Sequence, residues 1–183
     1  MMTWMTAMSL FDSAEALATD QLAQARRESE ALFYELVFDE FDDDLGKAPA
    51  PLRMMWTGYE TALAGYSIAC SAILVGRGIA TSQQALELSN TIEDLRRGGD
   101  PAPLEIPPWL SDTDVLSSHR SNLLRRWPDN YSWRRIPANM PYLWPVVDGD
   151  GEYELRLSKY DKELLASGER KLDKKIMERV TNA

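Results

Sequence analysis

The chain has 183 residues, a formal net charge of −9, 44% hydrophobic residues and 27% charged residues. This balance is typical of a soluble globular protein, so we expect residues 1–183 to form a single domain with its own core. No apolar run approaches the roughly 20 residues that a membrane-spanning helix requires, which excludes a membrane protein. A single cysteine, Cys70, excludes an internal disulfide and a cysteine-based zinc site, and indicates a reducing, cytoplasmic setting.

The negative charge is concentrated at one end of the sequence. Residues 1–50 hold 11 acids and 3 bases, a balance of −8, so the remainder of the chain is close to neutral. An acidic protein is poorly suited to coating nucleic acid nonspecifically, because neutralising phosphates requires lysine and arginine. A basic groove elsewhere in the chain is still compatible with this uneven distribution.

The first helical pattern begins at Asp12 and runs to about Phe38, with a break near Thr19 as an alternative. Its second part carries an apolar stripe made of Leu22, Ala25, Ser29, Leu32, Phe33 and Leu36. Glu28 lies at the border of this stripe, where partial desolvation raises the pKa of a carboxylate and suits it to acid–base chemistry. The alternative is a solvated glutamate at the edge of the helix. The acidic residues 39–44 lack calcium-loop spacing and predict a solvated loop.

The most apolar segment of the sequence, about 52–77, predicts a buried central helix that Gly76 and Gly78 end. Trp56 and Tyr59 lie within it, and core packing is the plainer interpretation of both. A capping box at 81–84 then opens a helix to Arg97, which Gly98 and Gly99 close. Residues 100–108 contain four prolines and predict an extended loop.

Residues 111–114 cap a further helix that bears His119, the only histidine, and that Pro128 ends. From His119 to Arg135 the chain carries five arginines, three aromatic residues and one acid. Guanidinium groups among aromatic rings suit a partner with phosphates to pair and bases to stack. The alternative is an amphipathic helix with solvated arginines. His119 and Asn122 lie near one helix face, from which both can face a common cleft.

The C-terminal part predicts a small β-hairpin near 142–157, with a glycine-containing turn at 148–151, and then an amphipathic helix from about 158 to 180. This helix either packs on its own domain or forms a homodimer. The predicted fold is therefore mainly α, a single-domain helical bundle around the central helix at about 52–77. No metal-ligand cluster, phosphate-binding loop or dinucleotide motif is present in the sequence, so no metal or cofactor is expected.

Four blocks occur together in a fixed order, and they read PLRMMWTGYE at 51–60, PPWL at 107–110, SHRSNLLR at 118–125 and MPYLWP at 140–145. Together they resemble an actinobacterial and phage branch of the pyrimidine-dimer DNA glycosylases, the endonuclease V-like superfamily. The resemblance covers residues 50–145 well and 10–35 weakly. It implies an all-helical core at 1–150, with 151–183 as a hairpin and helix extension.

The resemblance also implies an activity, in which the enzyme binds duplex DNA, flips a damaged or modified pyrimidine out and cleaves the base–sugar bond, with AP-lyase activity as an option. In the family an N-terminal amine attacks the sugar, and a glutamate preceded by an arginine manages the protons. Here Glu28 and Arg26 match this pattern, and Met1 or a water is the nucleophile. The family's glycine and lysine are Ala23 and Gln24 in this chain, and a family histidine is Ala50.

The same resemblance implies which residues contact DNA. The phosphates would be bound by Arg120, Arg125 and Arg126. The extruded base would stack on Trp56, Tyr59 or Trp127, and a base edge would be read by His119 and Asn122, unless those two only cap neighbouring loops. The alternative is a relative on the same scaffold without glycosylase chemistry, which binds nucleic acid or a protein, acts on modified bases or nucleotides, or uses its acidic first 50 residues to mimic DNA. A structural or regulatory oligomer is the third alternative.

Overall fold

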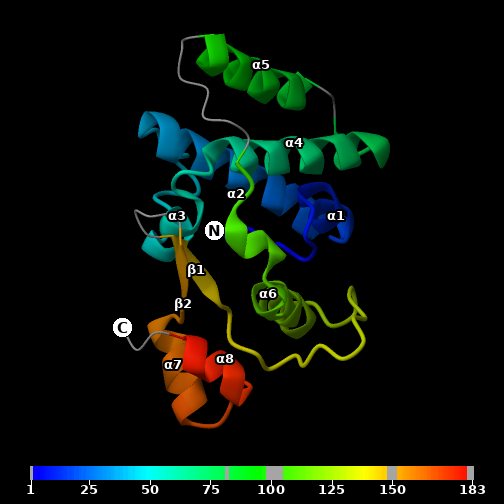
Figure 1. Cartoon of the computed structure of the whole chain (residues 1–183). Helices are drawn as coiled ribbons and strands as arrows, with labels where there is room; N and C mark the ends of the chain where they lie inside the picture. Colours follow the sequence, from blue (N-terminus) through cyan, green and yellow to red (C-terminus); the bar gives the residue numbers. More distant parts are fainter. Residues whose placement is uncertain (1, 81–82, 98–104, 148–151, 181–183) are drawn as a thin grey trace. The chain divides into compact units, whose positions relative to one another are not determined.

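The computed structural model describes residues 2–80, 83–97, 105–147 and 152–180. In this part of the chain the helices are α1 Leu10–Glu15, α2 Thr19–Phe38, α3 Ala50–Trp56, α4 Glu60–Gly76, α5 Gln83–Arg97, α6 Thr113–Arg126, α7 Lys159–Ala166 and α8 Lys174–Arg179 (Figure 1). A 3-10 helix, η1, covers Pro108–Ser111, and the strands are β1 Trp144–Val147 and β2 Tyr153–Arg156. The fold is mainly α with a small antiparallel hairpin, as the sequence predicts.

The contacts divide the chain into two units. The first unit holds the chain up to Trp4 together with Ser9–Pro107, and the second holds Met5–Met8 together with the chain from Pro108 onward. The expectation of a single domain stays a prediction. Within the described residues, no helix is both long and apolar enough to cross a bilayer.

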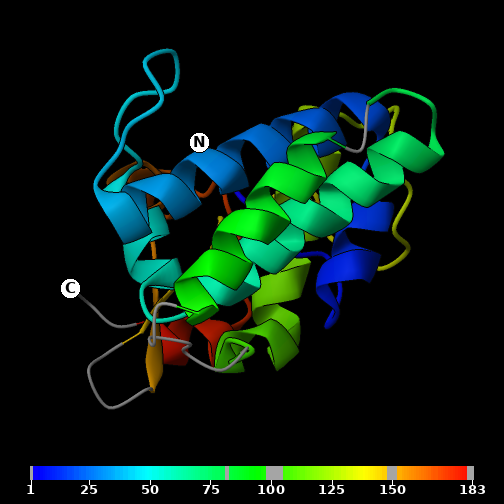
Figure 2. The same ribbon diagram turned by 90° about the horizontal axis from the view of Figure 1, so that it is seen from above.

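The first unit is built around α4, which packs against α1, α2 and α5. Figure 2 shows α5 (green) beside α4 (teal). The apolar stripe predicted on α2 is confirmed as far as Phe33, because Leu22, Ala25, Ser29, Leu32 and Phe33 are almost fully buried, whereas Leu36 is only half-buried. Tyr66 on α4 is also fully buried. The first unit therefore has a helical core whose α2 face the sequence pattern identifies correctly.

Two expected helices are interrupted in the first unit. The break near Thr19 is confirmed, since α1 ends at Glu15 and α2 begins at Thr19. The single helix expected at 52–77 is wrong, because α3 ends at Trp56 and α4 begins at Glu60. Between them Gly58 has a φ of 85°, a conformation that favours glycine, and its N–H donates to Glu60 Oε1 at 2.8 Å. The apolar pattern continues across this turn, so hydrophobicity alone does not reveal the break.

In the second unit, α6 begins where the sequence places its cap. Asp112 is the N-cap, and its Oδ1 accepts the N–H of Asp114 at 2.9 Å. The predicted hairpin is confirmed too, with β1 and β2 paired antiparallel from Trp144 opposite Arg156 to Val147 opposite Tyr153. The predicted hairpin turn at 148–151, the start of the capping box at 81–82 and the glycines at 98–99 lie outside the described residues.

The single C-terminal helix expected at 158–180 is wrong, because α7 ends at Ala166 and α8 begins at Lys174. Gly168, with a φ of 82°, ends α7, and its N–H donates to the Leu165 carbonyl at 3.1 Å. Ile176 and Val180 are 8% exposed, so the apolar side of α8 is covered within the chain itself. A homodimer through this region stays a prediction.

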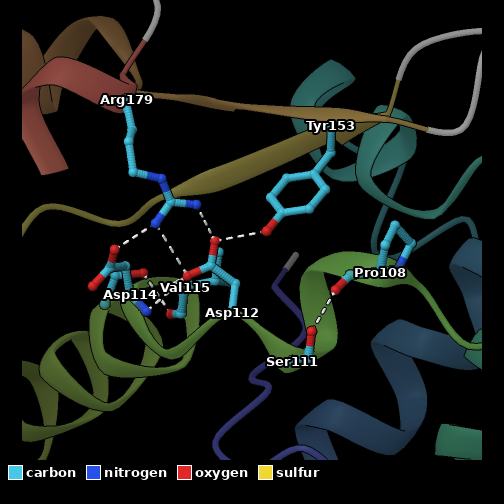
Figure 3. A network of polar contacts seen from close by, with 8 residues as sticks. Pro108, Ser111, Asp112, Asp114, Val115, Tyr153 and Arg179 are labelled. Atoms are coloured by element: carbon cyan, nitrogen blue, oxygen red, sulfur yellow. Dashed lines mark hydrogen bonds and ion pairs between the residues drawn. The ribbon is translucent and has the colours of Figure 1, made fainter.

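Arg179 connects the end of α8 to the start of α6 (Figure 3). Its guanidinium pairs with Asp112 and Asp114, and Tyr153 Oη donates to Asp112 Oδ2 at 2.7 Å. Burial by itself would raise the pKa of Asp112, but the hydrogen bonds from Arg179, Tyr153 and the Asp114 N–H outweigh it and lower that pKa. Burial and the bond to Asp112 raise the pKa of Tyr153 to about 12. The N-cap carboxylate is therefore held in its charged form by Arg179, Tyr153 and the backbone N–H groups that it caps.

We expect Arg179→Gln to lower the free energy of unfolding by about 2 kcal/mol at pH 7, because the largely buried Asp112 loses its cationic partner. Since the folded pKa of Asp112 lies below its unfolded value, this contribution is present above pH 4 and is lost as the pH falls through the folded pKa. Urea unfolding at pH 7 and pH 3 measures both effects. Arg156→Gln is the matched control, because Arg156 is as exposed as Arg179 but its partner Glu154 is 35% exposed and Asp112 is 4% exposed, and it should cost less than about 0.5 kcal/mol. Equal losses in the two variants would contradict this account.

Candidate functional site

Residues 2–4, which precede α1, are not helical, yet they are largely buried and held by side chains of the first unit. Thr3 and Trp4 are 0% exposed. The Trp56 indole N–H donates to Thr3 Oγ1 at 2.9 Å, and Tyr66 Oη donates to the Trp4 carbonyl at 3.0 Å. The Met2 N–H donates to Glu28 Oε2. Glu28 on α2 and Tyr66 on α4 therefore satisfy backbone groups that have no helix or sheet partner, while Trp56 on α3 holds the Thr3 side chain.

Glu28 is the acidic residue among these contacts. Its side chain is on α2 and only 4% exposed, which is deeper than the border position that the sequence predicts. While Oε2 accepts from Met2, Oε1 accepts the side-chain amide of Gln24 at 2.9 Å. Gln24 lies four residues earlier on the same helix and is therefore on the same face. In the resemblance, Gln24 stands where the family has a lysine. Its i, i+4 spacing from Glu28 is the sequence signal that the two side chains can contact each other.

Arg26, which the resemblance places in the catalytic set with Glu28, pairs with another acid of α2. Its Nη1 donates to Glu30 Oε2 at 2.6 Å. Burial raises the pKa of Glu30, Arg26 lowers it, and the charge of Glu87 raises it further. Met1, the third residue of the expected catalytic set, lies outside the described residues.

The two aromatic residues expected to stack on a base are both buried in the first unit. Trp56 is 0% exposed, and its indole N–H is used on Thr3. Tyr59 is 9% exposed and lies at the N-cap of α4. Burial, with a smaller effect of the Glu105 charge, raises the pKa of Tyr59. In this arrangement both rings contribute to packing, which is the plainer of the two interpretations.

The other expected DNA contacts belong to the second unit. His119 is fully buried; its Nδ1 accepts the Met5 N–H at 3.0 Å, and its ring stacks on Tyr142 with centroids 4.1 Å apart. Burial lowers the pKa of His119 to about 3, so the ring is neutral at pH 7. Asn122 is 6% exposed. Both side chains are thus enclosed by the protein instead of facing an open cleft.

Two of the expected phosphate-binding arginines bind backbone carbonyls. Arg120 Nε donates to the Thr6 carbonyl at 2.7 Å, and Arg125 Nη1 donates to the Met140 carbonyl at 3.0 Å. Burial, and then the neighbouring charge of Arg170, lower the pKa of Arg125. Arg120 therefore holds the N-terminal segment, and Arg125 holds the segment before β1. Sequence position alone does not reveal this, because both acceptors are distant in the chain.

The exposed cations of this stretch lie further along, on a surface that we call the 126–135 surface. The guanidinium of Arg126 lies 5.2 Å from the ring of Trp127, and both Arg134 and Arg135 are exposed. Tyr131 and Trp133 stack with centroids 4.8 Å apart and an interplanar angle of 10°. Arg135 also has a φ of 67°, which is uncommon for a residue other than glycine. Of the arginines named for phosphate binding, only Arg126 lies on this surface.

Within the described residues, no three or more histidine, cysteine, aspartate or glutamate side chains are grouped to hold a metal ion. No protein-family model, curated protein or solved structure matches this chain. In the first unit the chemically active group is the Glu28 carboxylate with its donors Met2 and Gln24. The exposed arginines are a separate feature of the second unit.

Proposed function

We propose that the protein is a DNA-base-processing enzyme, an N-glycosylase for damaged or modified pyrimidines that can also have AP-lyase activity. The observation that carries the proposal is the Glu28 carboxylate, which is 4% exposed and accepts the N–H of Met2, close to the beginning of the chain. A buried carboxylate held by two N–H donors is positioned to take a proton from a nucleophile or to stabilise positive charge on a sugar.

The proposed reaction begins with attack of an amine or a water on C1′ of the flipped nucleotide. The N-glycosidic bond breaks, its electron pair leaves with the base, and Glu28 takes a proton from the nucleophile. If the nucleophile is the α-amine of Met1, the C1′–O4′ bond then breaks and O4′ takes the proton that Glu28 had accepted, which leaves a protonated imine between C1′ and the enzyme nitrogen. The released base takes a proton from water. If it is water, the products are the free base and an abasic site. Gln24 holds Oε1 of Glu28 in both routes.

The 126–135 surface supports a nucleic-acid partner. Arg134 and Arg135 are exposed and can pair with phosphates, and the rings of Trp127 and Trp133 are partly exposed and can stack on bases. Such a local surface lets an acidic protein bind DNA at one place. We include these residues with Arg126 in the proposed DNA contacts.

The test is incubation of the full chain with duplex DNA that carries a panel of lesions and modified pyrimidines, with borohydride present. Borohydride reduces an imine to a stable amine, so we expect base release and a covalent adduct, and peptide mapping then identifies the amine. Base release without an adduct would assign water as the nucleophile. If a folded protein gives neither on any substrate, the glycosylase proposal is wrong.

A second candidate function is a scaffold relative without this chemistry that binds nucleic acid or protein. The observation that favours it is that Arg120 and Arg125 donate to backbone carbonyls of the protein itself. Salt-dependent DNA binding without base release would support this candidate.

A further inference from the structure

A pocket of about 380 Å³ lies in the first unit, beside α2 and the loop that follows it. Figure 2 shows this loop extending from the end of α2. Arg26 of the expected catalytic set is one of the lining residues, but Glu28, Gln24 and Met2, whose contacts carry the proposed function, are not. Its volume is at the lower end of the range of about 300–1,000 Å³ that is usual for ligand sites. The inference below goes beyond the proposed function and does not depend on it.

Two aromatic rings, those of Tyr34 and Phe41, form part of the lining. Phe41 is 44% exposed, so folding gains little from burying it. Lys47 Nζ lies 5.2 Å from the centroid of the Phe41 ring. The Phe41 ring therefore already attracts an ammonium group of the chain to one of its faces, and its other face can take a cationic ligand.

The charged groups of the lining favour a cation as well. Both of its guanidinium groups are already paired, Arg26 with Glu30 at 2.6 Å and Arg27 with Asp42 at 3.1 Å. Glu40 is a further acid of the lining and is exposed. The loop at 39–44 contains five acids and no base, which disfavours an anionic ligand such as a nucleic-acid phosphate.

The environment of Glu30 points in the same direction. Burial raises its pKa, and the charge of Glu87 on α5 raises it further, while Arg26 lowers it only in part. Glu30 also lines the pocket, so a cation bound there would lie near its carboxylate and favour the charged form.

We propose that this pocket binds an arginine side chain from a basic segment of a partner protein. A guanidinium is planar, so it can stack on Phe41 or Tyr34 while its N–H groups bond to Glu40. The acids of the 39–44 loop attract the other basic residues of the segment. An arginine fits better than a lysine because the lining offers flat rings together with a carboxylate.

The probe is a fluorescein-labelled peptide of ten residues that alternate arginine and serine, titrated with the full chain and followed by anisotropy. We expect one peptide to bind per chain, and Phe41→Ala to weaken binding about tenfold through loss of the cation–π contact. Glu40→Gln should weaken it about threefold at low salt. Phe11→Ala is the matched control, since Phe11 is 49% exposed, belongs to the same unit and is not part of the lining, and it should leave the affinity unchanged.

Three results would overturn the proposal. If Phe11→Ala weakens binding as much as Phe41→Ala, the ring contact is not specific. A second peptide of the same length replaces each arginine by lysine. If it binds as tightly as the arginine peptide, the attraction is only one of net charge. If spermidine displaces the peptide at equal concentration, the pocket is a polyamine site. Because both phenylalanines are exposed, neither substitution should unfold the protein, and circular dichroism checks this.

Discussion

Replacement of Glu28 by glutamine is expected to lower the rate of base release at least a hundredfold while DNA binding is retained. A residue that takes or gives a proton in the transition state contributes about 10²–10⁴-fold to the rate. Glutamine keeps the volume of the side chain but cannot accept a proton at pH 7. The glutamine amide also has an N–H₂ donor in place of one carboxylate oxygen, and this donor faces either the Met2 N–H or the Gln24 amide. Because two donors then meet, a loss of about 1–3 kcal/mol in the free energy of unfolding is expected as well. Single-turnover assays on the best substrate of the lesion panel measure the rate.

The matched control for this experiment is Glu35→Gln. Glu35 is on the same helix and 6% exposed, and its carboxylate accepts the Ala48 N–H at 2.8 Å. We expect this variant to lose stability but to release base at the wild-type rate. Equal rates for Glu28→Gln and the wild-type protein would remove Glu28 from the catalytic assignment, whereas equal losses in both variants would assign the effect to folding.

Lowering the pH from 7 to 5 is expected to cost about 2 kcal/mol of unfolding free energy through His119 alone. The folded pKa of His119 is about 3 and its unfolded value is near 6.5. Between these values the unfolded chain binds more protons than the folded chain. The contribution of His119 to the free energy of unfolding is therefore fully present above pH 6.5 and decreases as the pH falls toward 3. The physical cause is burial, since a protonated ring would be charged in the core and would lose the Met5 N–H bond that Nδ1 accepts.

His119→Asn tests this account, because an asparagine side chain does not titrate and its Oδ1 can still accept the Met5 N–H. The variant should be less stable at pH 7, since the ring that stacks on Tyr142 is lost, but its stability should change by less than about 0.5 kcal/mol between pH 7 and pH 5. Glu30, whose raised pKa acts in the opposite sense, is present in both proteins and cancels in the difference. The same pH slope in variant and wild type would show that His119 is not the titrating group.

The parts of the fold that depend on neighbouring residues were predictable from the sequence. The stripe on α2 identifies its buried face, Asp112 caps α6, and the hairpin of β1 and β2 lies where alternating residues flank a glycine-containing turn. These features arise from helix and strand periodicity and from capping, which act over a few residues. The same reasoning fails at Gly58 and Gly168, where short turns interrupt apolar patterns that continue on both sides.

The partners of the candidate site residues were decided by the tertiary structure. Glu28 was identified as a border carboxylate from its helix position, but its contact with Met2 joins residues 26 positions apart. Arg120 reaches Thr6 across 114 positions, so a guanidinium expected to bind phosphate holds the N-terminal segment instead. Composition and spacing by themselves determined a mainly helical, acidic protein with a cationic, aromatic stretch near 119–135. Which of those cations are exposed, and which carboxylate is buried beside the N-terminal segment, depended on long-range packing, because a buried donor or acceptor is satisfied by whichever group the fold brings to it.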